Sequence, residues 1–308
     1  MPATAPRLKK SVPGSEADLA APEAAGNPIS TAGFGRFQRL IQQETGIWLA
    51  EHKMALLCGR LARRLRSLSL ATLDQYYELV TRPDQDEERR LMVDAITTNE
   101  TRFFRDSRHF EFLEQHAIPR WQAEAQRGQR PRRLRVWSAG CSSGEEPYSL
   151  AMVLARRLPA EQGWNTPILA TDISTRMLEQ AGSGIYSIAK SADIPESLLK
   201  TYMLKGIDAH QGEMKVTPEI AAMVDFERLN LTQGPYPPEK HFDLIFCRNV
   251  LIYFALPFKQ QVARQLAGCL AGGGVLFLGQ AENLSGMDVA LRSVAPAVYV
   301  HAGEQSGF

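Results

Sequence analysis

Two adjacent carboxylates follow a glycine-rich turn at a place where phosphate binding would be expected. The segment reads WSAGCSSGEEPY and places Glu145 and Glu146 directly behind Gly140 and Gly144. Turns of this kind between a strand and a helix usually bind phosphate, because free amide groups and the helix dipole favour an anion. Two carboxylates would repel a diphosphate but suit a ligand with an ammonium or sulfonium group. The alternative is that the acids only stabilise the helix N-terminus, which is worth about 0.3–1 kcal/mol.

A single acid, Asp172, ends the next apolar segment along the chain. An acid at this point of an α/β fold can accept hydrogen bonds from both hydroxyl groups of a ribose. Helix capping is the competing explanation, although Ser174 or Thr175 could also provide the cap. A ribose and a cationic group without phosphate together describe S-adenosylmethionine.

Polar and aromatic side chains alternate in the segment TTNETRFFRD. The two phenylalanines could simply pack in a core, with the following arginine paired to its neighbouring acid. In the other interpretation, Asn99, Thr101 and Arg105 reach the ligand, and the Arg105 guanidinium holds its carboxylate with two hydrogen bonds. The residue types alone support both interpretations.

A strongly apolar segment, FDLIFCRNVLIYF, carries two polar residues at the predicted end of its strand. Arg248 and Asn249 would lie at the carboxyl end of this strand, where ligands bind in open α/β sheets. Tyr253 follows within one turn. Further upstream, Asn230 and Leu231 could border an adenine, with an amide for its edge and an apolar side chain for its face.

Four arginines gather in the segment GRLARRLR, at Arg60, Arg63, Arg64 and Arg66. Leucines occupy the opposing stripe of the same predicted helix. Such a charged face is often only solvated. The alternative is that an acidic partner docks here by long-range attraction.

The elements that must position these residues fall into two parts. From residue 34 to 116, apolar residues recur at helical spacing and no strand stands out. After a polar connector the pattern changes, with strands expected at 134–138, 167–171, 242–247 and 275–279 and helices at 148–158, 175–181 and 258–270. This alternation predicts a mostly parallel sheet with helices on both faces. The glycine-containing interval 182–217 fits less well and is interpreted as a small insertion.

Composition limits the classes of function. The chain of 308 residues is 44% hydrophobic and 22% charged, as expected of a soluble globular protein, and its net charge of +1 argues against nucleic acid as a partner. The 4 cysteines and 6 histidines show no metal-ligand spacing, so no metal site is predicted, and a reducing cytoplasm is the simplest location. Residues 1–30 resemble a disordered tail rather than a signal peptide, and no apolar run approaches the ~20 residues of a membrane helix.

Five motifs in sequence order resemble those of the chemotaxis receptor methyltransferases, the CheR family. They are TTNETRFFRD, RVWSAGCSSGEEPYSLAM, ATDIS, FDLIFCRNVLIYF and GGGVLFLGQAENL, and the resemblance covers residues 34–299. It implies an N-terminal all-helical domain (31–120) and a Rossmann-like class I methyltransferase domain (130–308) with a small β insertion (182–217). It also implies a protein-glutamate O-methyltransferase, which transfers a methyl group from S-adenosylmethionine to glutamate carboxylates of membrane chemoreceptors.

The resemblance also implies roles for particular residues. The cofactor contacts would be Asn99, Thr101, Arg105, Glu145, Asp172, Asn230, Leu231, Arg248 and Asn249, with Gly140 allowing close approach of the backbone. Glu145 would bind the amino group of the cofactor, whereas Glu146 would support the turn. The four arginines of the basic helix would dock the acidic methylation helix of a receptor. Some family members hold a receptor pentapeptide through the insertion, but Asp208 stands where another glycine is expected here, which argues against such a tether. We expect a monomer.

The expected reaction needs no general base, because a glutamate with a reference pKa of about 4.3 is already ionised near pH 7. Catalysis would consist mainly of orientation and desolvation. Tyr253 is the first candidate to steer the acceptor carboxylate, and Arg120 is the second. Two alternatives remain open: an NAD-dependent oxidoreductase, which the GxxxG spacing disfavours, and a non-catalytic module that senses S-adenosylmethionine and binds a signalling partner.

Overall fold

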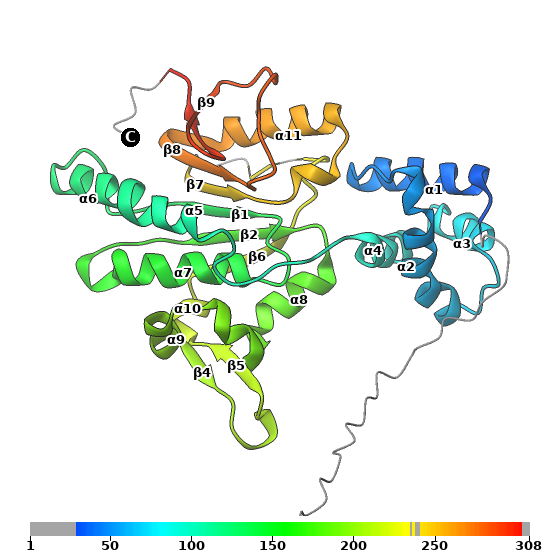
Figure 1. Ribbon diagram of the computed structural model, residues 1–308, viewed down its shortest axis with the longest axis horizontal. Coiled ribbons are helices and arrows are strands. Elements are labelled where there is room, and N and C mark those ends of the chain that lie inside the picture. The colour runs from blue at the N-terminus through cyan, green and yellow to red at the C-terminus, as the bar shows by residue number, and fades with distance from the viewer. Residues whose placement is uncertain (1–28, 235, 238–240, 304–308) are drawn as a thin grey trace, which may run out of the picture.

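The computed structural model describes residues 29–234, 236–237 and 241–303. Except for Ile29 and Ser30, the tail predicted for residues 1–30 lies outside the described residues. A helical domain and a larger α/β domain lie side by side (Figure 1). No helix in the described ranges is both long enough and apolar enough to span a bilayer.

The N-terminal domain is built from helices alone. Its α-helices are α1 (Thr31–Thr45), α2 (Met54–Ser67), α3 (Leu73–Val80) and α4 (Asp86–Ile96). Local chemistry starts two of them: the Ser30 hydroxyl accepts from the Gly33 amide at 3.0 Å, and Thr72 forms a capping box with Gln75. Their apolar faces meet in a core that includes Phe34, Phe37, Ile41, Leu57, Leu61, Tyr76 and Met92. The prediction of an all-helical domain is confirmed.

A seven-stranded sheet with the order β6-β2-β1-β7-β8-β10-β9 forms the centre of the larger domain (Figure 1). The strands are β1 (Val136–Ala139), β2 (Ile168–Asp172), β6 (Val224–Arg228), β7 (Phe242–Cys247), β8 (Leu270–Leu278), β9 (Leu291–Ala295) and β10 (Val298–His301). From β6 to β8 the strands are parallel, whereas β10 pairs antiparallel with β8 and β9. Every residue of β1 and β2 is buried, as expected for parallel strands that are covered on both faces. The mostly parallel sheet is therefore confirmed.

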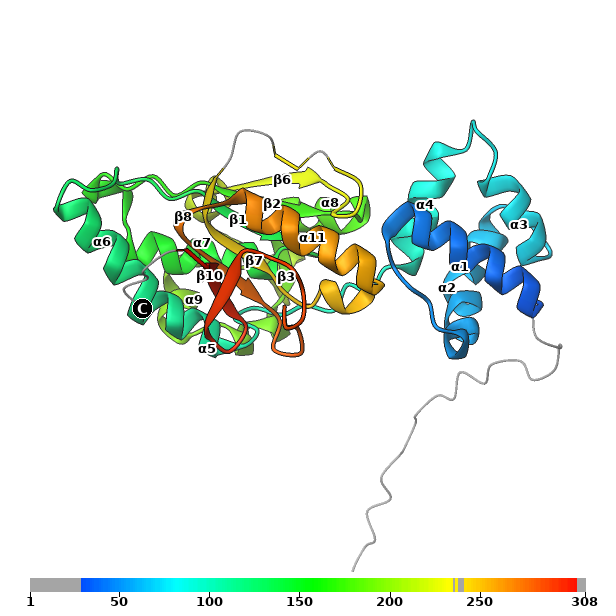
Figure 2. The ribbon, with the colours of Figure 1, turned by 90° about the horizontal axis from the view of Figure 1, so that it is seen from above.

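Helices cover both faces of this sheet (Figures 1 and 2). One face carries α5 (Ser107–Phe112), the π-helical turn η2 (Leu113–Ala117), α6 (Ile118–Gln126) and α7 (Glu145–Arg157), and the other carries α11 (Leu256–Cys269). The sequence placed residues up to 120 in the helical domain. In the structure Phe110, Leu113 and Ile118 instead pack in the core of the sheet domain, because their apolar side chains face the sheet.

The predicted insertion forms a separate small sheet with the order β3-β5-β4. Its antiparallel strands are β3 (Ile185–Ser187), β4 (Met203–Lys205) and β5 (Glu213–Val216), joined by η4 (Ile188–Asp193), α9 (Glu196–Tyr202) and η5 (Asp208–His210). It follows α8 (Thr175–Ser183), precedes α10 (Pro218–Ala221) and projects from the body of the domain (Figure 1). The prediction of a small β insertion is confirmed.

The two domains contact each other directly. Ile47 forms an isolated antiparallel bridge with Phe254, and the Trp48 amide donates to the Tyr253 carbonyl at 2.9 Å. These contacts hold the end of α1 over the carboxyl edge of the sheet.

Candidate active site

A cavity lies where the two domains meet, at the carboxyl ends of β1, β2 and β7. Parallel α/β sheets bind ligands at this edge. The lining residues include Thr45, Ile47, Asn99, Thr101, Arg105, Gly140, Ser142, Glu146, Asp172, Asn230, Leu231, Arg248, Asn249 and Tyr253. The fold therefore brings together most of the side chains that the sequence indicated, although they come from widely separated segments.

The glycine turn after β1 brings its backbone close to the cavity. Gly140 has a φ of +83°, and a Cβ atom at this position would lie 2.4 Å from Val250 Cγ2. The amides of Gly140 and Cys141 both donate to the Thr171 carbonyl, at 2.8 and 2.9 Å, and so tie the turn to β2. Because only glycine fits there, no side chain separates this backbone from a ligand.

Asp172 ends β2 with its carboxylate at the cavity wall. The residue is 8% exposed, and its two carboxylate oxygens accept from the Ser142 amide at 2.8 Å and the Ser174 amide at 2.9 Å. Burial raises the pKa of Asp172, and the hydrogen bonds from these amides oppose the increase. A buried carboxylate oriented in this way is ready to accept further hydrogen bonds from ligand hydroxyl groups.

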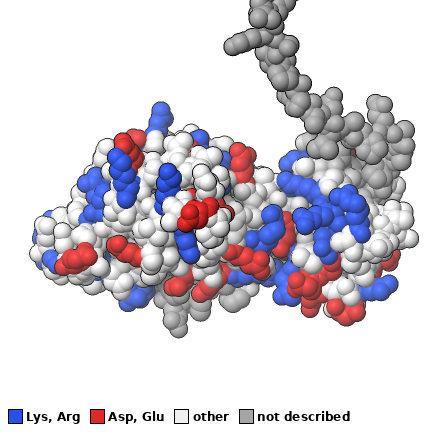
Figure 3. Space-filling view, turned by 90° about the horizontal axis from the view of Figure 1, so that it is seen from below, with Lys and Arg blue, Asp and Glu red and all other residues white. Residues whose placement is uncertain are grey.

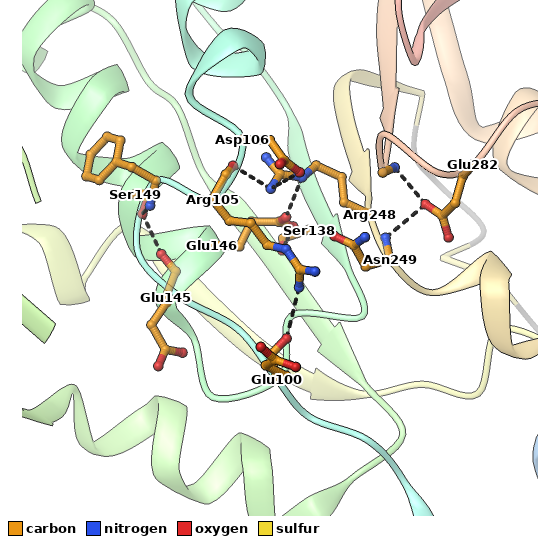
Figure 4. Close-up of polar contacts among 12 residues, drawn as sticks. Glu100, Arg105, Asp106, Ser138, Glu145, Glu146, Ser149, Arg248, Asn249 and Glu282 are labelled. Carbon is orange, nitrogen blue, oxygen red and sulfur yellow. Dashed lines mark hydrogen bonds and ion pairs between the residues drawn. The ribbon is translucent and has the colours of Figure 1, made fainter. Parts of the chain in front are cut away.

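Glu145 and Glu146 point to different sides of α7 (Figure 4). Glu146 lines the cavity, where it accepts from the Ser138 hydroxyl at 2.8 Å and lies 3.3 Å from Arg248 Nε. Burial raises the pKa of Glu146, and Arg248 is the main opposing influence. Glu145 is fully buried and does not line the cavity, contrary to the role expected from the sequence. Consecutive helical residues differ by about 100° in direction, so only one of the two carboxylates can face the ligand.

Arg248 is a buried cation beside Glu146. It is 5% exposed, donates to the Arg105 carbonyl at 2.5 Å and lies 3.4 Å from the Asp106 carboxylate (Figure 4). Burial lowers the pKa of Arg248, whereas Glu146 and Asp106 raise it. Its Nη1 atom has no hydrogen-bond partner among the described residues. The guanidinium thus compensates the charge of Glu146 and keeps a donor for a ligand.

Asn249 is held in an unusual backbone conformation at the end of β7. Its φ is +59°, and its amide donates to Glu282 Oε2 at 2.8 Å (Figure 4). The Gly279 amide donates to the same oxygen at 2.6 Å. The buried Oδ1 atom of Asn249 has no partner within the described ranges. Glu282 lies in the motif GGGVLFLGQAENL, but its supporting role was not predicted from the sequence.

The segment between the domains supplies both core and cavity residues. Phe103 is 1% exposed, and its ring packs edge-on against Tyr186 with centroids 4.9 Å apart. Asn99, Thr101 and Arg105 line the cavity. The packing interpretation therefore holds for Phe103, whereas Asn99, Thr101 and Arg105 lie where a ligand in the cavity could be reached.

Asn230 and Leu231 lie at the cavity but use their side chains differently. The Asn230 amide donates to the Glu44 carbonyl at 2.7 Å, and its Oδ1 accepts from the Thr232 amide at 3.0 Å. This side chain therefore connects the two domains, so its amide is already engaged. Leu231, which is 6% exposed, offers an apolar wall.

The two candidate steering residues are far apart. Tyr253 is half-buried and lines the cavity. Arg120 belongs to α6, contacts the Gly273 carbonyl and lies 3.4 Å from Glu124. It does not line the cavity, because α5 and α6 run along the sheet to the end away from the helical domain (Figure 1). The prediction for Arg120 does not fit the structure.

A second cleft, of about 720 Å³, lies between the helical domain and α8. It is lined by Arg60, Arg63, Arg64, Arg90, Arg176 and Arg228, together with Glu87, Asp94 and Glu179. Lys and Arg side chains gather over the helical domain in Figure 3. Arginines outnumber acids in this lining, so the cleft is basic although the whole chain is nearly neutral.

The four arginines of the basic helix are not equivalent. Arg64 Nη2 lies 2.5 Å from the buried Glu88 carboxylate, so its charge is compensated. Arg60 donates at 2.8 Å to a threonine hydroxyl in the segment between the domains. Arg63 and Arg66 are exposed, and neither forms an ion pair with any residue that the structure describes. Arg63 also lines the cleft and Arg66 does not, so Arg63 is the member best suited to meet a partner there.

Comparison with known proteins agrees with this geometry. Residues 32–97 match the family model described as CheR methyltransferase, all-alpha domain, and residues 99–300 match CheR methyltransferase, SAM binding domain. The chain is 40% identical to the chemotaxis protein methyltransferase of Escherichia coli over 84% of this chain and 87% of that protein. It is 36% identical to chemotaxis protein methyltransferase 2 of Pseudomonas aeruginosa, over 86% and 91% of the two chains. The chain therefore belongs to the CheR methyltransferase family, and its cofactor is S-adenosylmethionine.

Proposed function

We propose that this chain transfers the methyl group of S-adenosylmethionine to glutamate side chains of chemoreceptors and forms glutamyl methyl esters. One observation carries the proposal: a cavity lined by two carboxylates, the buried Asp172 and the partly buried Glu146, adjoins a cleft lined mainly by arginines. The cavity suits a nucleoside with a cationic end, and the cleft suits an acidic protein segment. Methylation in chemotaxis is what the names of the relatives describe.

Residues of the methyltransferase domain and of the segment between the domains would hold the cofactor. The Asp172 carboxylate would accept hydrogen bonds from the ribose hydroxyl groups, and the Glu146 carboxylate would accept them from the ammonium group. The Arg105 guanidinium would bind the carboxylate of the methionine part. Leu231 would pack against the adenine. The cavity fits such a ligand because the Nη1 group of buried Arg248 has no hydrogen-bond partner among the described residues and can donate to a ligand atom. We thus transfer to Glu146 the role that the sequence suggested for Glu145.

The protein's part in the reaction would be to orient and desolvate the acceptor. When bound, S-adenosylmethionine supplies an electrophilic methyl group, which an acceptor carboxylate oxygen takes up as the neutral thioether leaves. The acceptor needs no base, because a glutamate carboxyl has a reference pKa of about 4.3. The Tyr253 hydroxyl at the cavity would donate a hydrogen bond to the acceptor carboxylate. This bond would orient one carboxylate oxygen into the cavity. Closure of the cavity by residues of both domains would exclude water.

The basic cleft would dock the acidic acceptor helix. Asp94 and Ala95 line the cleft and Thr97 and Thr98 line the cavity, so the two sites adjoin at the end of α4. An acidic helix in the cleft would therefore present a side chain to the cavity. Attraction by exposed arginines would also accelerate its encounter with the enzyme.

We propose that docking does not need a receptor pentapeptide and that the enzyme acts as a monomer in the cytoplasm. Asp208, in the loop between β4 and β5, has a φ of +50°, a conformation that favours glycine. An aspartate thus replaces the additional glycine expected of versions that bind a tether.

Methyl transfer to receptor membranes tests the proposal. The protein is incubated with methyl-labelled S-adenosylmethionine and membranes that contain chemoreceptors, and the products are then treated with base. Glutamyl methyl esters release volatile labelled methanol, whereas methylated amines retain the label. Matched membranes without chemoreceptors provide the control. Label that resists base, or equal labelling of the control membranes, would contradict the proposal.

A further inference from the structure

A second ion pair lies directly behind the glycine turn, and the proposed reaction does not use it. Glu145 begins α7, is 0% exposed, and contacts the Lys190 ammonium. The Ser143 hydroxyl donates to the other carboxylate oxygen at 2.7 Å. Lys190 comes from η4 of the insertion, so the countercharge of a buried residue in the methyltransferase domain is supplied by a different subdomain.

Tyr186 of the insertion contacts the same turn. Its hydroxyl donates to the Ser143 carbonyl at 2.7 Å, and the residue is 3% exposed. A Cβ atom at Gly144 would lie 2.8 Å from this hydroxyl, so the turn and the insertion are in close contact. The Tyr186 ring also packs against Phe103 of the segment that lines the cavity.

The turn therefore has a front and a rear with different partners. At the front, Gly140, Ser142 and Glu146 line the cavity. At the rear, Ser143 and Glu145 bind the insertion. Because these residues alternate along one short stretch of backbone, displacement of the rear residues must also move the front residues.

We infer that the insertion holds the cofactor turn in its binding geometry, with Lys190 and Tyr186 as positioning residues for S-adenosylmethionine. The inference uses the cofactor cavity described above and is independent of the identity of the acceptor. In this role the insertion supports the cofactor site, which is a function separate from any contact with a receptor.

Charge makes Lys190 the more important of the two residues. A buried carboxylate that loses its cation is strongly unfavourable, so it moves toward water or takes up a proton. Either response would alter Glu145 and thereby disturb its neighbour Glu146. The ammonium group of the cofactor requires the Glu146 carboxylate to face the cavity. Glutamine at position 145 would need no cation and could still accept from Ser143.

Binding of S-adenosylhomocysteine, measured by calorimetry, tests this inference. Lys190→Met should raise the Kd at least about tenfold, which corresponds to ~1.4 kcal/mol. Lys200→Met is the matched control, because Lys200 pairs with Glu196 at 2.5 Å on the exposed surface of the same subdomain. Its Kd should stay within about twofold of the wild type. The double variant Lys190→Met/Glu145→Gln should regain most of the lost affinity, which a purely destabilising effect of Lys190→Met would not explain.

Several outcomes would overturn the inference. One is a Kd of Lys190→Met within about twofold of the wild type, and another is a double variant no tighter than Lys190→Met. If Lys190→Met does not fold, Tyr186→Phe removes only the hydroxyl and should weaken binding about threefold, so an unchanged Kd would overturn the inference. A wild-type protein that failed to bind would instead refute the cavity assignment, and this inference with it.

Discussion

Replacement of Glu146 by glutamine is the sharpest perturbation of the proposed cofactor site. Glutamine preserves the size of the side chain and can still accept the hydrogen bond from Ser138 that measures 2.8 Å. It removes the negative charge that lies 3.3 Å from Arg248 Nε and faces the cavity. A hydrogen bond to a charged group contributes about 1.5–3 kcal/mol and a neutral one about 0.5–1.5 kcal/mol. The difference of about 1–1.5 kcal/mol predicts a Kd for S-adenosylhomocysteine raised roughly five- to thirteenfold.

Calorimetric titration with two nucleosides separates this effect from general damage. S-adenosylhomocysteine carries the amino acid part of the cofactor, whereas methylthioadenosine lacks it and keeps the adenosine. Glu146→Gln should therefore weaken only the first ligand. Asp172→Ala should weaken both at least about tenfold, or ~1.4 kcal/mol, because the ribose is common to them. Thermal unfolding of each variant shows whether the protein is folded at the temperature of the titration.

The pattern across the two ligands decides the result. If Glu146→Gln weakened both nucleosides equally, its carboxylate would not contact the ammonium group. If Asp172→Ala left methylthioadenosine affinity unchanged, the ribose assignment would be wrong.

Three further predictions concern pH, docking and the turn. Burial raises the pKa of Glu146, and the ammonium needs its ionised form. Affinity for S-adenosylhomocysteine should therefore fall on acidification through that raised pKa, and titrations from about pH 8 to about pH 5 should show a smaller fall in Glu146→Gln, where only Asp172 of the two carboxyls remains. The double reversal Arg63→Glu/Arg176→Glu, at two exposed arginines that line the cleft, should lower methylation of receptor membranes about tenfold at low salt without changing cofactor affinity, and an unchanged rate would locate docking elsewhere. Gly140→Ala places a Cβ atom 2.4 Å from Val250 Cγ2 and should weaken cofactor binding, so normal affinity in calorimetry would show that the turn tolerates the change.

Elements with strong local patterns were predictable from the sequence. The strand expected at 242–247 is β7 (Phe242–Cys247), and the one expected at 167–171 is β2 (Ile168–Asp172). Apolar runs and turn residues lie next to each other in the chain, so they specify local conformation directly. The strand β6 (Val224–Arg228) was not predicted, since most of its residues are at least partly exposed and it lacks a continuous apolar pattern.

The positions of candidate site residues at the ends of strands were predictable for the same reason. Asp172 ends one apolar strand and Arg248 follows another, and the carboxyl ends of parallel strands meet at one edge of a sheet. Arg120 was misplaced because sequence proximity to the segment between the domains does not show which way α5 and α6 run. Arg64 could not be recognised as a paired residue, since its partner Glu88 lies on another helix.

By itself, the sequence determined the family, the cofactor and the chemical types that meet at the strand ends, because those features depend on residue order and local conformation. Only the tertiary structure decided that Glu146 faces the cavity while Glu145 pairs with Lys190 of the insertion. A rotation of about 100° between neighbouring helical residues separates these two roles. Which carboxylate faces the cavity and which pairs with a lysine of the insertion is set by packing against segments distant in the chain, which no local pattern records.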